Sequence, residues 1–75
     1  MTGKLIEAAK GRQRLRSGEG RALRVRLGLS LAACAEPLHV TPTSLWLWEA
    51  GGRLTDEHAA RYERLFARLE RELAP

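Results

Sequence analysis

Several kinds of residue are scarce in this chain, and each scarcity excludes a class of site. The single cysteine, Cys34, excludes a disulfide within the chain and a zinc site built from several cysteines. The two histidines, His39 and His58, lack the spacing of metal ligands, so we expect neither a metal nor another cofactor. No apolar run approaches the length of a membrane span, and residues 2–10 lack the apolar centre of a secretion signal. We therefore expect a soluble, cytoplasmic protein that contacts no membrane.

The sequence also lacks the residue patterns that are typical of an active site. The carboxylate side chains occur among basic neighbours on expected helix surfaces, and no glycine-rich loop follows a strand pattern. Cys34 has no activating base close to it in the sequence and lies in a run of small apolar residues, which favours a buried thiol over a nucleophile. We expect no catalytic residue and no small-molecule ligand.

The apolar residues that are present repeat with the period of an α-helix. The clearest repeat lies in residues 56–73, where Thr55 is a good N-cap and acidic side chains occupy the first turn. Its apolar positions recur every three or four residues: Ala59, Tyr62, Leu65, Phe66, Leu69 and Leu73. No segment is a convincing strand, and 75 residues suffice for one small domain with a core of marginal size. The sequence therefore predicts an all-α fold, a small bundle of four to five helices.

Positive charge is concentrated in the N-terminal third. Residues 1–26 hold eight basic and two acidic side chains, whereas residues 27–75 hold five basic and seven acidic ones. Within residues 11–20, glycine and serine are interspersed with Arg12, Arg14 and Arg16, a composition typical of a flexible segment. We expect residues 1–20 to form a basic arm, with a short helix near its start, ahead of a domain over residues 21–75. Such an arm favours a polyanion, such as double-stranded DNA, as the partner.

Residues 28–51 have the capping pattern of two short helices joined by a tight turn. Ser30 is a good N-cap for a first helix, which should fray near Pro37 because proline lacks a backbone donor. The three residues after Pro37 would form the turn, and Thr41 would then cap a second helix over residues 42–50. Two helices joined in this way are the unit that places its second helix in the major groove of DNA.

The same residues follow a known pattern, without an inserted or missing position. The matching positions are Gly28, Leu29, Ser30, Ala35, Val40, Thr41, Leu45, Trp48, Glu49 and Gly51. In these positions the segment resembles the helix-turn-helix of small transcriptional regulators of the Cro and lambda-repressor type. Pro37 and His39 depart from the family, which usually has a lysine-like residue and a glycine there. The resemblance implies a repressor-like regulator, such as those of phages and mobile elements, that occupies operator DNA as a dimer.

The resemblance also implies roles for individual residues. Base edges would be contacted by one face of the second helix: Pro42, Thr43, Ser44 and Leu47. Phosphates would be contacted by the arm and by residues near the helix ends: Arg12, Arg14, Arg16, Ser30, Thr41 and Arg53. Arg24 and Glu49 match a family pair of arginine and glutamate and would form an ion pair. Because bidentate arginine or glutamine base readers are missing, specificity would rest partly on the arm and on DNA shape.

The two tryptophans should have different environments. Trp46 and Trp48 lie about 200° apart around a helix, so one should be buried and the other exposed. We expect Trp48 in the core. Trp46 would then form a dimer contact, a DNA-backbone contact or a packing contact with the C-terminal helix.

The C-terminal helix also predicts a homodimer, at least on DNA. Its interface would use one stripe of the helix: Tyr62, Phe66, Leu69 and Leu73. With Ala59 and Leu65, this stripe is wider than packing on two or three short helices would cover. The alternative is that the whole stripe belongs to the core of one chain.

Two other functions fit the same residues. A helix-turn-helix fold whose second helix is apolar, through Trp46 and Leu47, would suit a protein-protein interaction module such as an antitoxin or antirepressor. Residues 40–54 also resemble the motif of small phage excisionases, which bend DNA and would need a β-hairpin after Gly52, where residues 55–73 favour a helix. Salt-dependent binding to duplex DNA separates the DNA-binding interpretations from the interaction module.

Overall fold

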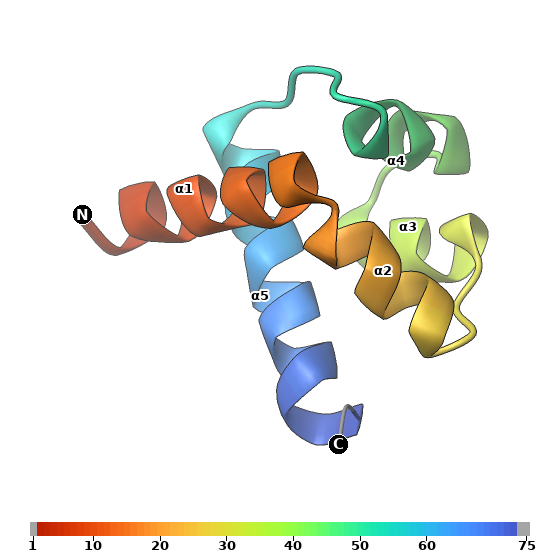
Figure 1. Cartoon of the computed structure of the whole chain (residues 1–75). Helices are drawn as coiled ribbons and strands as arrows, with labels where there is room; N and C mark the ends of the chain where they lie inside the picture. The colour runs from red at the N-terminus through yellow and green to blue at the C-terminus, as the bar shows by residue number, and fades with distance from the viewer. Residues whose placement is uncertain (1, 74–75) are drawn as a thin grey trace.

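Five helices are formed by residues 2–73, the part of the chain that the computed structural model describes (Figure 1). They are α1 (Thr2–Ser17), α2 (Glu19–Arg26), α3 (Leu31–Leu38), α4 (Pro42–Glu49) and α5 (Asp56–Leu73). The prediction of an all-α bundle is confirmed, since these residues contain no strand. None of the helices combines the length and the apolar composition that crossing a membrane requires. Within residues 2–73, no three His, Cys, Asp or Glu side chains are grouped so that they could hold a metal ion.

Helix α5 carries the centre of the core. Its N-cap is Thr55, whose Oγ1 accepts a hydrogen bond from the backbone N–H of His58 (3.1 Å). Its apolar stripe faces inward, where the fully buried rings of Tyr62 and Phe66 stack with their centroids 4.1 Å apart. The other members of this core come from α1 to α4: Leu15, Leu23, Cys34, Ala35, Leu38, Leu45 and Trp48. The stripe of α5 is therefore the surface on which the other helices pack.

Helices α1 and α5 cross at a contact between small residues. Ala8 on α1 packs against Ala59 and Ala60 on α5, and all three side chains are completely buried. A Cβ atom added to Gly11 would overlap the backbone carbonyl oxygen of Ala59, so this close approach requires glycine. Figure 1 shows the two helices crossing, with the first turns of α1 extending beyond the rest of the molecule.

The flexible basic arm predicted for residues 1–20 is wrong, because residues 2–17 form helix α1 and pack on α5. The interspersed glycines have structural roles instead. Gly11 permits the helix crossing, and Gly18, with a φ of 83°, forms the turn between α1 and α2. Leu15, which lies within the expected arm, is a member of the same core as Tyr62 and Phe66.

Ion pairs add to the contact between α1 and α5. Arg14 donates from Nε and Nη2 to the two carboxylate oxygens of Glu63 (3.0 and 3.2 Å), and 15% of the Arg14 side chain is exposed. The hydrogen bond to Glu63 raises the pKa of Arg14. Two residues before Arg14 on the same helix, Arg12 pairs with Asp56 at 2.7 Å. These arginines, which the sequence assigned to a free arm, are held by carboxylates of α5.

Helix α3 ends one residue after Pro37, close to where the sequence predicts it to fray, and the difference is that Leu38 belongs to the helix and not to the turn. Pro37 lies in the last turn, where its missing N–H removes one hydrogen bond from an exposed segment that water can solvate. The helix ends at Leu38, and His39 adopts a left-handed φ of 60°. The N–H of Val40 then donates to the carbonyl oxygen of Ala35 (3.2 Å), which closes the helix end as a glycine-type cap would.

Candidate nucleic-acid interface

Helices α3 and α4 form the two-helix unit that the sequence predicts. Ser30 Oγ accepts from the N–H of Ala33 (3.0 Å) and Thr41 Oγ1 accepts from the N–H of Ser44 (3.1 Å), so both helices begin with a side-chain cap. Each is eight residues long, which corresponds to about 12 Å. The major groove of DNA is about as wide. In Figure 1, α4 lies at the upper edge of the molecule, above α3.

The side chains at the start of α4 differ in their exposure to solvent. Pro42 and Thr43 are exposed, whereas Ser44 is half-buried. The hydroxyl of Thr41 donates to Oγ of Ser44 (3.0 Å) while the Thr41 oxygen caps the helix. The side chains of Thr41 and Ser44 are thus engaged in local structure, which leaves Thr43 as the exposed hydroxyl at this end of α4.

The remainder of α4 divides into a buried and an exposed face. Leu45 and Trp48 lie in the core, with 0% and 7% of their surface exposed, whereas Trp46 and Leu47 are 55% and 48% exposed. The predicted difference between the two tryptophans is therefore confirmed. Because Trp46 lies on the surface, it does not pack in the core beside the C-terminal helix.

Arg24 on α2 holds the end of α4 through the ion pair that the sequence predicts. Its Nε and Nη2 donate to the two carboxylate oxygens of Glu49 (2.7 and 2.9 Å), and its Nη1 donates to the carbonyl oxygen of Leu29 (3.0 Å). Only 11% of the Arg24 side chain and 3% of the Glu49 side chain are exposed. The hydrogen bond to Glu49 raises the pKa of Arg24. The pair thereby fixes the last turn of α4 relative to α2.

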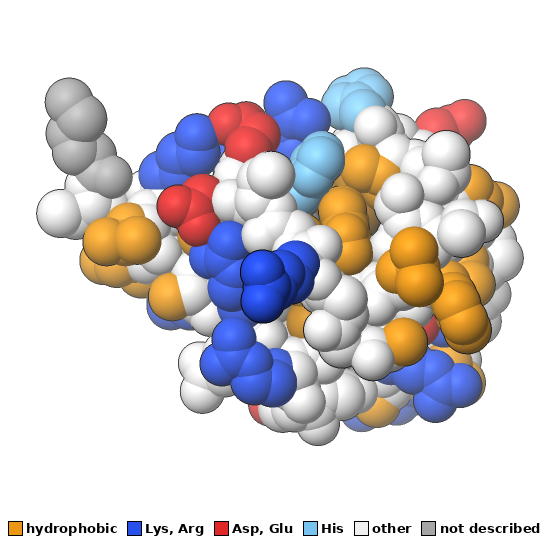
Figure 2. Space-filling model, turned by 90° about the horizontal axis from the view of Figure 1, so that it is seen from above, with side chains coloured by type: hydrophobic (Ala, Val, Ile, Leu, Met, Phe, Trp, Pro, Cys, Tyr) orange, Lys and Arg blue, Asp and Glu red, His pale blue; other side chains and the backbone are white. Residues whose placement is uncertain are grey.

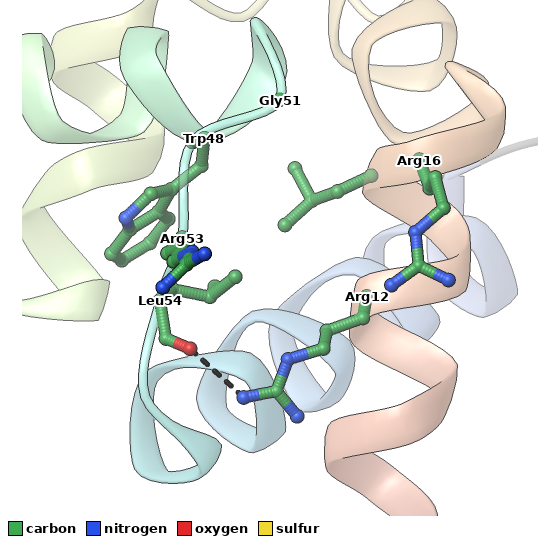
Figure 3. A pocket seen from close by; sticks show the side chains of 8 residues that line it. Arg12, Arg16, Trp48, Gly51, Arg53 and Leu54 are labelled. Carbon is green, nitrogen blue, oxygen red and sulfur yellow. Dashed lines mark hydrogen bonds between the residues drawn. The ribbon is translucent and has the colours of Figure 1, made fainter.

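Three of the predicted phosphate-binding arginines line one cavity of about 330 Å³, between α1 and the loop that joins α4 to α5. Arg12 and Arg16 extend from successive turns of α1, and Arg53 lies across the cavity on the loop (Figure 3). The apolar residues of the wall are Leu15, Trp48 and Leu54. Figure 2 looks down on this end of the molecule and shows basic side chains gathered near the middle of the face, with apolar side chains beside them.

The other predicted phosphate contacts are not brought to this cavity. The Arg14 guanidinium lies 3.0 Å from Glu63 and 3.5 Å from Glu70, so its charge is met within the fold. Arg14 is therefore no longer a candidate for a phosphate contact. Ser30 and Thr41 lie at the exposed starts of α3 and α4, where their side-chain oxygens accept backbone N–H groups as helix caps. The Thr41 hydroxyl donates to Oγ of Ser44, whereas capping leaves the Ser30 hydroxyl able to donate to a phosphate oxygen.

The dimer interface predicted on α5 is wrong for Tyr62 and Phe66, because both side chains are completely buried within one chain. Leu69 is half-buried against the same core, and Leu73 is 58% exposed at the end of the helix. The stripe belongs mainly to the core of the monomer, as the alternative interpretation held. The prediction underestimated how much of the α5 stripe is buried by other helices of the same chain, because it treated residues 1–20 as an arm. In the structure, α1 also packs on α5.

Sequence reasoning missed how the loop after α4 is held. Arg12 donates from Nη2 to the carbonyl oxygen of Leu54 (2.8 Å), which joins α1 to the loop. The N–H of Gly52 donates to the carbonyl oxygen of Leu47 (2.7 Å), an approach that a Cβ atom on residue 52 would crowd. The four-residue spacing of Arg12 and Arg16 places both side chains on one face of a helix, but nothing in the sequence indicates that this face contacts the loop.

Cys34 and the histidines have structural surroundings. Cys34 is buried, and its burial raises the pKa of the thiol, which keeps the thiol protonated near neutral pH. The rings of His58 and Trp48 lie beside each other with centroids 5.2 Å apart. His39 forms the turn after α3.

The chain matches no protein-family model, no curated protein and no solved structure. Its function must therefore be inferred from the residues and the geometry described above.

Proposed function

We propose that this chain is a sequence-specific DNA-binding regulator that inserts the start of α4 into the major groove of operator DNA. The observation that carries the proposal is the pair of capped helices α3 and α4, in which the start of α4 is exposed while Leu45 and Trp48 anchor its other face in the core. Helix pairs of this kind dock with the N-terminal residues of the second helix against base edges. The chain would act as a repressor by blocking a promoter, in the cytoplasm of a bacterium or of a phage-infected host, and would have no catalytic role.

Base contacts would come from Thr43 and Leu47 more than from Pro42 and Ser44. The Thr43 hydroxyl can donate to or accept from a base edge, and its methyl group can pack on the methyl group of thymine. Leu47, one turn further along, offers a second apolar contact and is 48% exposed. The Ser44 hydroxyl is already bonded to Thr41. Since these contacts discriminate bases weakly, part of the specificity would rest on the shape of the DNA.

The proposal includes a homodimer that places two α4 helices on half-sites about one DNA turn apart. The buried Tyr62 and Phe66 cannot form its interface. The exposed end of α5, which carries Leu73, can, with Leu69 at its edge. Sedimentation with and without DNA measures the stoichiometry directly. A single chain bound to a single half-site would remove the dimer from the proposal.

Selection of bound fragments from a random duplex library tests the proposal. We expect a consensus of two symmetric half-sites. We also expect Thr43→Ala to change the preferred bases at one or two positions, without a change in melting temperature, because Thr43 is exposed. Thr2→Ala, an equally small change on the exposed start of α1, is the matched control. Recovery of unrelated fragments, or identical preferences for Thr43→Ala and the wild type, would refute sequence-specific recognition by α4.

The second candidate function is a protein-protein interaction module, which the exposure of Trp46 and Leu47 favours. Large apolar side chains in contact with water are enriched at protein interfaces. If this function is correct, the wild-type chain will lack salt-dependent affinity for duplex DNA. The excisionase-like alternative has less support, since residues 52–73 form a loop and α5 in place of the β-hairpin that it needs.

A further inference from the structure

We propose that the cavity between α1 and the α4–α5 loop is a phosphate-binding site, in which Arg16 and Arg53 bind the phosphate oxygens and Arg12 positions the loop. Two sources supply this chemistry: the DNA backbone beside α4, or a small phosphorylated compound. The backbone source deepens the proposed function and rests on it. The small-compound source is independent of that function.

The charges around the cavity favour an anion. Among residues 2–73, neither Arg16 nor Arg53 lies within 4.0 Å of a carboxylate oxygen, although both line the same cavity. Most other cations there are paired with carboxylates: Lys4, Arg12, Arg14, Arg21, Arg24, Arg61, Arg64 and Arg68. Two guanidinium groups that share a cavity without a counter-charge repel each other, and a bound phosphate would remove that repulsion. The planar guanidinium also donates two parallel hydrogen bonds to phosphate oxygens.

The loop that carries Arg53 is held on both sides. Before it, Gly51 adopts a φ of 102°, a conformation that favours glycine, and the N–H of Gly52 is bonded to the end of α4. After it, the carbonyl oxygen of Leu54 accepts from Arg12 Nη2 (2.8 Å), a hydrogen bond drawn in Figure 3. The backbone of Arg53 is therefore positioned before any ligand arrives, which lowers the entropy lost on binding.

The size and wall of the cavity suit a phosphate ester better than a bare ion. Its volume of about 330 Å³ is near the lower end of small-molecule sites, which measure about 300–1,000 Å³. The apolar side chains of Leu15, Trp48 and Leu54 can contact the sugar or carbon chain that carries the phosphate. Since Trp48 and Gly51 belong to the end of α4 and its loop, a phosphate held here would lie beside the proposed DNA-reading helix.

Binding of a small phosphate is tested by fluorescence. The chain has two tryptophans, so Trp46→Phe leaves Trp48, which lines the cavity, as the reporter. Ribose 5-phosphate is titrated at constant ionic strength, with ribose as the uncharged reference. The small-compound source predicts a saturable change that Arg16→Ala together with Arg53→Ala abolishes. Arg68→Ala together with Arg71→Ala removes the same charge from the far end of α5 and should leave the change intact.

Binding of the DNA backbone is tested with the same two double variants, made in the chain that keeps Trp46. Each lost phosphate contact should make the slope of log affinity against log salt shallower by about 0.9, which is about an eightfold loss of affinity near 0.1 M salt. The backbone source predicts a slope shallower by about 1 to 2 for the Arg16 and Arg53 pair, and a smaller change for the Arg68 and Arg71 pair.

The outcomes separate this proposal from the proposed function. A response to ribose 5-phosphate, or a shallower salt slope specific to the Arg16 and Arg53 pair, supports the site and identifies its source. If the wild type binds DNA and the cavity variants change neither measurement, the phosphate site is refuted and the proposed function stands. If the wild type binds ribose 5-phosphate through these arginines but no DNA, the proposed function fails and the site stands.

Discussion

Replacement of Arg24 by alanine measures how far the two-helix unit depends on its ion pair with Glu49. The substitution removes two hydrogen bonds to the Glu49 carboxylate and one to the carbonyl oxygen of Leu29. It leaves a carboxylate whose side chain is 3% exposed, with the solvent-exposed Arg21 3.8 Å away. A buried ion pair that loses one partner in this way costs about 3–5 kcal/mol, because the remaining charge stays desolvated.

That cost is large for a chain of 75 residues, whose free energy of unfolding is about 4–11 kcal/mol at typical values per residue. About 1 kcal/mol shifts the melting temperature of such a domain by about 4–8 °C. We therefore expect Arg24→Ala to lower the melting temperature by about 15 °C or more. Arg26→Ala, an exposed position on the same helix, should lower it by less than about 4 °C.

Thermal and urea unfolding, followed by circular dichroism, provide the measurement. Glu49→Gln in the Arg24→Ala background should recover part of the loss, because an unpaired buried amide costs less than an unpaired buried carboxylate. Equal melting temperatures for Arg24→Ala and Arg26→Ala would show that the pair contributes nothing to the fold and would refute this reasoning.

Three further predictions concern the packing of α1 and α5. Gly11→Ala should lower the free energy of unfolding, measured in urea titrations, by more than about 2 kcal/mol, because the added Cβ overlaps the backbone oxygen of Ala59. Gly3→Ala is the control and should not lower it, because the space around Gly3 is open. Arg14→Ala should cost about 2–4 kcal/mol by leaving the buried Glu63 unpaired, and should leave the salt dependence of DNA binding unchanged. Burial raises the pKa of Tyr62, so the unfolded state ionises first and stability should fall as the pH rises above about 10. Tyr62→Phe should reduce this loss of stability at alkaline pH. Because the Tyr62 hydroxyl has no hydrogen-bond partner among residues 2–73, the substitution should change the free energy of unfolding at neutral pH by less than about 1 kcal/mol.

The features that the sequence predicted correctly depend on residues close together in the chain. A cap joins a side chain to a backbone N–H three residues later, as at Ser30, Thr41 and Thr55. The separation of Trp46 from Trp48 follows from helix geometry alone. The pair of Arg24 and Glu49 spans 25 residues, and its prediction needed the resemblance, because composition does not give a contact at that distance.

The features that were predicted wrongly depend on partners far along the chain. Gly11 was interpreted as a sign of flexibility, but it serves a contact with Ala59 that only the packed helices create. Likewise, the burial of Tyr62 and Phe66 depends on how many helices cover α5, and α1 had been counted as an arm. Local composition describes what a segment can do in isolation, whereas packing between distant segments decides whether a glycine loosens a helix or permits a crossing.

The uneven distribution of charge along the chain also acquires a different meaning in the fold. Three of the eight basic side chains in residues 1–26 pair with carboxylates of α5: Lys4, Arg12 and Arg14. The excess of basic residues in that third of the sequence therefore reflects, in part, the joining of α1 to α5. Because a polyanion competes poorly for a guanidinium that a buried carboxylate already holds, the number of basic residues overstates the cations available to DNA. Those that remain are better identified by their lack of an internal partner, and Arg16, two residues from Arg14 but on the face that lines the cavity, is one of them.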